Sequence, residues 1–190
     1  KYMLTIFGLA ACRVVVPLAC ALGVGFATGR IRQSGGTVTL KRTEKRCAAF
    51  VGLCGGTGEW ALSGGAVDIA GFAYVGGVTT NEVGVYSASS PLDKFVSLIG
   101  ERLGQARGTL RLTGGTFKVG KDLVLSGDGT GALELGPDAA LAVGGRLDAR
   151  AGSKLVVDVR GYTGHSRTLA TFAGGTATAF DEANVALLQD

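Results

Sequence analysis

The most regular pattern in the chain is an alternation of apolar and polar residues, interrupted by glycines. In "GTLRLTGGTFKVG", residues 108–120, apolar side chains take every second position from Leu110 to Val119, on both sides of Gly114-Gly115. A period of two is typical of a β-strand with one buried face. Glycine suits a sharp turn because it adopts positive φ without steric cost. The stretch therefore predicts two short strands that meet at the Gly-Gly pair.

The alternation recurs at nearly constant spacing along the middle of the chain. Strand-like segments follow one another as "TLRL", "ALEL" and "KLVVDV", then "TFKV" and "ALAV", then "DLVL" and "RLDA". Three short strands per coil of about 23 residues are the signature of a parallel β-helix, in which each coil buries its inner row against the next. We therefore predict an all-β parallel solenoid with three columns of stacked apolar residues: Leu110, Leu133 and Leu155; Phe117 and Leu141; Leu123 and Leu147.

Gly-Gly pairs followed by alternating apolar and polar residues also occur upstream, at less even spacing. They occur as "QSGGTVTL" at 33–40 and "LSGGAVDIAG" at 62–71, and the interval that follows is long enough to hold an insertion. Within it, Ser90 and Pro91 resemble a helix start, with an N-cap followed by proline at the first helical position. We predict a short flanking helix at 90–104, with a strand at "KFVSLIG" as the alternative.

Residues 2–28 form a strongly apolar run after Lys1, interrupted by Arg13 and Pro17. A basic start, an apolar stretch and small residues near its end are the parts of a signal peptide. A membrane helix is the rival, although Arg13 would cost about 2.5–3.5 kcal/mol near its centre. We predict that residues 1–30 are an export signal or a membrane segment; a buried element of the fold is the third alternative.

All the cysteines lie in the first 54 residues: Cys12, Cys20, Cys47 and Cys54. Zinc sites normally have closer pairs, such as two cysteines separated by two residues, and no histidine lies nearby. Disulfides in any of three pairings and free thiols all remain open.

Composition agrees with many tight turns between short strands, since the 190 residues include 33 glycines and only three prolines. The net charge is +4, and its basic residues cluster near the N-terminus. Because this cluster has no interleaved aromatic residues and no nucleic-acid-binding motif, we predict a solvated basic face and no nucleic-acid partner. Its members are Arg30, Arg32, Lys41, Arg42, Lys45 and Arg46.

Two pairs of aspartates are candidate catalytic carboxylates, because glycosidic cleavage needs two carboxyl groups about 5–10 Å apart. Asp148 and Asp158 fall on adjacent coils, as do Asp128 and Asp138. Each occupies an outward-facing or turn position, where a polar residue is expected without any catalytic role. We therefore predict solvated strand and loop residues there.

The remaining candidate chemistry is also weak. His165, beside Ser166, is the only histidine, and no nucleophile-elbow motif accompanies it. "SGDGTG" at 126–131 has the composition of a calcium turn but lacks the repetition that such sites use. We predict no catalytic, cofactor-binding or metal site.

The motifs "SGGTV", "SGGAVDIAGFAYVGG" and "LTGGTFKVGKDLVLSG", with the closing "KLVVDVRGYTGHSRTLATFAGG", resemble the Gly-rich β-strand repeats of autotransporter-associated passenger domains and related bacterial surface proteins. The resemblance covers roughly residues 31–188. It implies a right-handed parallel β-helix, export to the cell surface and a structural or adhesive role.

These observations predict β-helix repeats over 31–158 and a C-terminal capping region over 159–190, where the period is lost. The predicted function is that of a non-enzymatic structural or adhesive module of an exported bacterial surface protein, whose ligand is a surface glycan or a protein. The N-terminal segment would associate with a membrane if it is not removed. A carbohydrate-active β-helix enzyme, a polysaccharide lyase or hydrolase, is the alternative.

Overall fold

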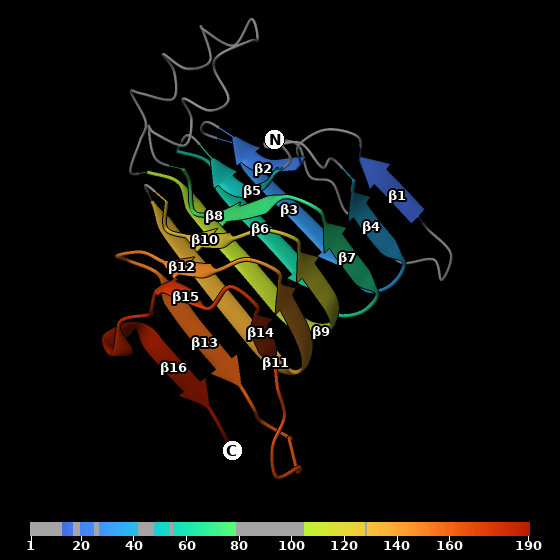
Figure 1. Cartoon of the computed structure of the whole chain (residues 1–190), viewed down its shortest axis with the longest axis vertical. Helices are drawn as coiled ribbons and strands as arrows, with labels where there is room; N and C mark the ends of the chain where they lie inside the picture. Colours follow the sequence, from blue (N-terminus) through green and yellow to red (C-terminus); the bar gives the residue numbers. More distant parts are fainter. Residues whose placement is uncertain are drawn as a thin grey trace, which may run out of the picture.

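Strands paired in parallel dominate the structure, a computed structural model (Figure 1). Within the described residues the one helical element is the 3-10 helix η1 (Glu182–Asn184). The prediction of an all-β protein with parallel sheets is thereby confirmed. The structure describes residues 13–16, 20–24, 27–41, 48–53, 55–78, 105–127 and 129–190.

The strands stack in three parallel ladders, which we call the first, second and third ladder. The first ladder contains β3 (Thr28–Gln33), β6 (Thr57–Leu62), the first half of β9 (Arg107–Val119), the first half of β11 (Thr130–Val143), β13 (Lys154–Asp158) and β16 (Val185–Leu188). The second contains β1 (Arg13–Val16), β4 (Thr37–Leu40), β7 (Ala66–Ile69), the second halves of β9 and β11, and β14 (Ala170–Phe172). The third contains β2 (Cys20–Val24), β5 (Ala48–Leu53), β8 (Phe72–Val75), β10 (Leu123–Leu125), β12 (Leu147–Ala149) and β15 (Thr176–Thr178).

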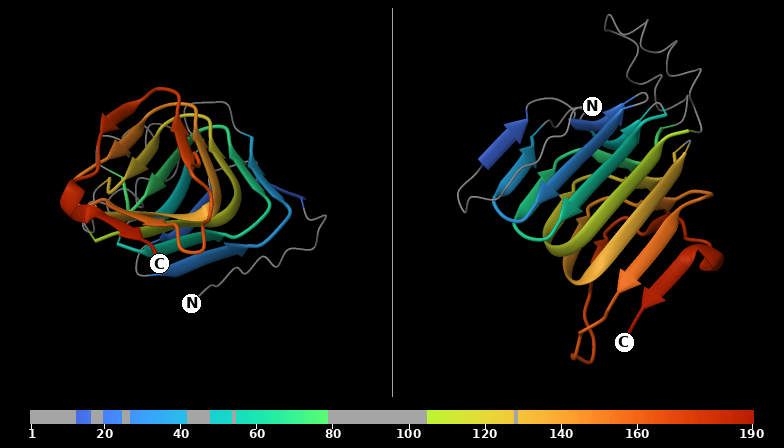
Figure 2. Two further views of the ribbon diagram at one scale, coloured as in Figure 1. Left: turned by 90° about the horizontal axis from the view of Figure 1, so that it is seen from below. Right: turned by 180° about the vertical axis from the view of Figure 1, so that it is seen from behind.

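Two strands join the first and second ladders into one ten-stranded sheet, because β9 and β11 are long enough to take part in both. The third ladder is a separate six-stranded sheet. Seen along the stack, the ladders surround a common interior (Figure 2).

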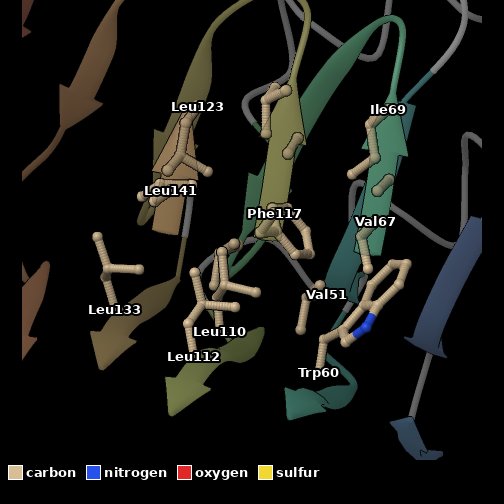
Figure 3. Close-up of a cluster of buried hydrophobic side chains, with 14 of the residues drawn as sticks. Val51, Trp60, Val67, Ile69, Leu110, Leu112, Phe117, Leu123, Leu133 and Leu141 are labelled. Atoms are coloured by element: carbon tan, nitrogen blue, oxygen red, sulfur yellow. The ribbon is translucent and has the colours of Figure 1, made fainter. Parts of the chain in front are cut away.

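The interior is filled by the apolar columns that the repeat predicts. Leu133 pairs directly with Leu110 on one side and with Leu155 on the other. Phe117 pairs with Leu141, and Leu123 pairs with Leu147, so all three predicted columns are confirmed. These side chains lie together in the core, where Trp60 packs edge-on against Phe117 with ring centroids 5.4 Å apart (Figure 3).

Stacked glycines form the corner between the first and second ladders. Gly65 and Gly115 have φ of +85° and +79°, a region that residues with side chains rarely adopt. A Cβ on Gly65 would lie 2.4 Å from the carbonyl oxygen of Gly36 in the coil before it, and one on Gly115 would lie 2.6 Å from that of Gly65. The Gly-Gly pairs thus allow paired segments of the chain to approach closely where each one bends.

The upstream repeats belong to the same ladders, despite their uneven spacing. Thr57 pairs directly with Arg107, although the two lie far apart in the sequence, so the ladder continues past the predicted insertion. The helix predicted at 90–104 lies outside the described residues.

Parts of the apolar N-terminal segment also pair with the ladders, since β1 pairs with β4 and β2 pairs with β5. That pairing supports the third alternative for this segment, an element of the fold; its role in export or membrane association stays a prediction. No helix among the described residues is both long enough and apolar enough to span a membrane. Cys20 begins β2, whereas Cys12, Cys47 and Cys54 lie outside the described residues.

Residues 159–190 add three strands to the stack, one to each ladder: β14, β15 and β16. Their partners lie 29 or 30 residues back along the chain, whereas β9 and β11 pair at 23 or 24. The longer spacing explains why the period is lost in the sequence. The capping role of this region stays a prediction.

Candidate functional site

The outer face of the first ladder carries a row of alternating charges, which we call the charged row: Arg30, Glu59, Arg111 and Glu134. It crosses four neighbouring parallel strands, because these residues take outward positions on β3, β6, β9 and β11. Inward neighbours on the same strands are buried apolar residues. The two-residue period of the strands therefore places the core on one side and the row on the other.

Ion pairs link the row across the strands. Arg30 pairs with Glu59, and Arg111 Nη1 lies 3.2 Å from Glu59 Oε1. Arg111 also donates from Nε and Nη2 to the two carboxylate oxygens of Glu134. This contact with Glu134 raises the pKa of Arg111 above its ordinary value, with a smaller contribution from Glu59. Arg111 therefore stays charged and fixed in orientation.

Arg111 retains capacity for a ligand. A guanidinium has five N–H donors, and three of those on Arg111 are used by the two glutamates. Its side chain is 46% exposed, whereas that of Glu59 is 13% exposed. The arginine thus offers its remaining donors to solvent while the carboxylates lie deeper.

A hollow of about 250 Å³ adjoins Arg111 and Glu134 on the same outer face. Val156 and Leu188 line it together with Asp158 and Arg160, which form a two-point contact of 2.8 and 2.9 Å. The Arg160 side chain is the main cause that lowers the pKa of Asp158 to about 2, followed by the Arg160 backbone N–H. The site is therefore a shallow, water-open recess with apolar and ionic walls.

A second hollow, of about 200 Å³, lies on the other side of Thr113, which lines both. Arg32, Ser34 and Gln33 contribute to its lining. Gln33 is buried, and its Nε2 donates to the backbone oxygen of Ala66 at 3.1 Å. Both hollows are lined by residues of the first ladder, and Thr113 is common to the two.

The structure places Asp148 and Asp158, one of the two candidate pairs of carboxylates, in different ladders. Asp148 lies on β12 in the third ladder, whereas Asp158 lies on β13 in the first. Asp148 is bound by Arg150 at 2.8 Å and Asp138 by Arg167 at 3.0 Å; Asp128 lies outside the described residues. A general acid in glycosidic cleavage needs a raised pKa, which is the opposite of the shift at Asp158.

The other predicted positions are structural or exposed in the described part of the chain. His165 is exposed in a loop where the hydroxyl of Tyr162 donates to the backbone oxygen of Ser166 at 2.8 Å. In the 126–131 turn, Ser126 Oγ accepts a 2.7 Å hydrogen bond from the Gly131 N–H. Within the described ranges no three His, Cys, Asp or Glu residues are grouped to hold a metal ion.

The predicted basic face is only partly solvated where it is described. Arg30 belongs to the charged row, and Arg32 and Lys41 are exposed. Residues 42–46 lie outside the described residues. Sequence reasoning assigned Arg30 to a cluster and missed its partner Glu59, although their spacing equals that of the Gly-Gly pairs at 35 and 64. A search for charged residues at outward positions separated by the repeat spacing would have identified the charged row.

Comparison of the chain with protein-family models, with curated proteins and with solved structures finds no match. The resemblance to autotransporter-associated repeats therefore stays a prediction from the motifs.

Proposed function

We propose that the chain is a right-handed parallel β-helix that serves as a non-enzymatic structural and adhesive module of an exported bacterial surface protein. Successive strands visit the three ladders in a fixed order, and each returns to a ladder one step along the stack. The crossover between parallel strands of one sheet is almost always right-handed, which supports that hand here.

The observation that carries the adhesive role is the charged row with its adjoining hollows. A long, flat outer face can make many weak contacts with an extended polymer, and their combined effect exceeds that of any one. Arg111 and Arg160, whose side chains are 46% and 57% exposed, suit carboxylate groups that repeat along the polymer. The ligand we propose is therefore an acidic surface glycan, bound along the first ladder without cleavage.

Binding to immobilised polygalacturonate, with neutral dextran as the comparison polymer, tests this function. We expect Arg111→Gln to weaken retention about tenfold, which corresponds to about 1.4 kcal/mol. Arg146→Gln is the matched control, because Arg146 is 59% exposed and paired to Asp122 outside the charged row. Equal retention of both variants would contradict the proposed site.

The same incubation separates adhesion from the alternative enzyme. A hydrolase releases new reducing ends, and a lyase leaves an unsaturated sugar that absorbs in the ultraviolet. We expect retention with neither product. Cleavage of the polymer by the purified chain would replace the adhesive proposal with the enzymatic one.

Export to the bacterial surface is supported by the apolar segment and by the motif resemblance, and it is tested separately. Intact bacteria that produce the full-length natural protein are treated with a protease that cannot enter the cell. Loss of this region from the intact cells is the expected result, and full protection would contradict surface display.

A further inference from the structure

Positive and negative side chains alternate from strand to strand across the outer face of the first ladder. The strands β3, β6, β9, β11 and β13 lie side by side in this order (Figure 1). Basic residues lie on β3, on β9, and on or directly after β13: Arg30, Arg32, Arg107, Arg111, Lys154 and Arg160. The strands between them, β6 and β11, contain Glu59 and Glu134 and no lysine or arginine. The cations of this face therefore lie on every second strand.

The register of the ladder gives the interval between these cations. Arg32 pairs with Ala61, and Ala61 pairs in turn with Arg111, so the two arginines share one outward column with a small side chain between them. Because neighbouring strands lie about 4.8 Å apart, their backbones are separated by about 9.6 Å. Arg160 follows β13, which lies two strands beyond β9, since β11 pairs with both. Three exposed arginines thus recur along the stack at every second strand.

The two hollows extend from one cation-bearing strand to the next. The smaller hollow is lined from Arg32 on β3, across β6, to Thr113 on β9. The larger is lined from Arg111 on β9, across β11, to Arg160 after β13. Their linings combine apolar side chains, such as Val156, with hydroxyl and carboxylate oxygens. The hollows therefore provide room for an uncharged ring between successive arginines.

The glutamates on the intervening strands disfavour a second acidic group between the arginines. The side chains of Glu59 and Glu134 are 13% and 29% exposed, so both carboxylates reach the surface. A carboxylate repels a carboxylate of the ligand, whereas it accepts hydrogen bonds from a hydroxyl or an amide N–H. The ligand that matches this face therefore carries an acidic group on every second unit and hydrogen-bond donors on the units between.

We propose that the polymer bound along the first ladder is a glycan in which acidic and uncharged sugars alternate. It lies across the strands with one sugar per strand, since one sugar of an extended glycan advances by nearly the spacing of two neighbouring strands. Acidic sugars then meet Arg32, Arg111 and Arg160, and uncharged sugars lie over β6 and β11. The inference rests on the proposed glycan-binding function and adds the order of sugars that the surface selects.

Calorimetric binding of oligosaccharides with equal numbers of sugars separates this inference from the proposed function. Hyaluronate fragments alternate glucuronate with N-acetylglucosamine, whereas oligogalacturonate carries a carboxylate on every sugar. At one fixed salt concentration, we expect the whole 190-residue chain to bind hyaluronate fragments about tenfold more tightly. Equal binding, or tighter binding of oligogalacturonate, would overturn the alternation and leave the proposed function intact. Absence of binding to both would overturn the proposed function as well.

Arg32→Gln and Arg107→Gln form a matched pair of variants, because each removes one exposed guanidinium from the same face. Arg32 shares a column with Arg111 and lines a hollow, whereas Arg107 pairs with Thr57 and Thr130 and lines neither hollow. We expect Arg32→Gln to weaken the binding of hyaluronate fragments about tenfold, and Arg107→Gln to weaken it less than about twofold. Equal weakening would show that total charge governs binding and would overturn the inference. Circular dichroism checks that both variants keep their strands.

Discussion

The loss in the free energy of unfolding on shortening a leucine should depend on where its strand lies in the stack. Leu133→Ala removes three carbon atoms from a side chain that is 1% exposed and held between Leu110 and Leu155. At about 0.8 kcal/mol per buried carbon, the transfer free energy alone is about 2.4 kcal/mol. The cavity left between coils raises the total to about 3–4 kcal/mol.

Leu187→Ala makes the same chemical change at a side chain that is 58% exposed. Less than half of the transfer free energy is at stake there, and no closed cavity forms, so we expect a loss of about 1 kcal/mol or less. Urea unfolding followed by fluorescence measures both losses, because Trp60 is the only tryptophan and is fully buried. Equal losses for Leu133→Ala and Leu187→Ala, or a loss below about 1 kcal/mol for Leu133→Ala, would refute the assigned columns.

Other predictions concern the corners, one ion pair and the histidine loop. Gly65→Ala should cost more stability in urea unfolding than Gly175→Ala: both have positive φ, but a Cβ meets backbone only at Gly65, so equal losses would refute the close approach of coils. The carboxyl of Asp158 should titrate near pH 2 by carbon NMR, and its pKa should return toward the ordinary value in Arg160→Gln. Because this pKa is lower in the folded chain than in the unfolded chain, it adds stability at pH values above the unfolded-state pKa, and that stability is lost as the pH falls toward 2. His165→Ala should change the free energy of unfolding by less than about 0.5 kcal/mol, because the residue is exposed, and a larger loss would show an unrecognised contact.

The columns could be predicted from the sequence where coils have equal length. Leu110, Leu133 and Leu155 repeat at a nearly constant interval, and stacked parallel strands place such residues directly opposite each other. Where the interval changes, the sequence indicates the turn but not the pairing. The partners of β6 and β9 follow from the structure, because an insertion between two coils leaves no trace in the alternation itself.

The apolar N-terminal segment could not be assigned from its pattern. A continuous apolar run has no period that separates an export segment from strands buried in a fold. The pairing of Val14 with Val38 and of Leu22 with Val51 is long-range information that composition does not contain.

The charged row was missed for a different reason. Comparing the inward, apolar positions of successive repeats identifies the core. Glu59 and Glu134 become informative only when the outward positions are also compared at the repeat spacing. Arg111 joins both because neighbouring strands lie close enough for one guanidinium to reach two carboxylates. The hollows beside the row depend on side-chain packing, which the sequence does not specify.

Distances between leucine methyl groups test the central claim, that coils stack in parallel register, most directly. Adjacent strands lie about 4.8 Å apart, and next-but-one strands lie at about twice that distance. In a methyl-labelled sample we expect nuclear Overhauser contacts from Leu133 to both Leu110 and Leu155, with none between Leu110 and Leu155. Absence of the two expected contacts, or a direct contact between the outer two leucines, would contradict the stacked ladders and the proposals that rest on them.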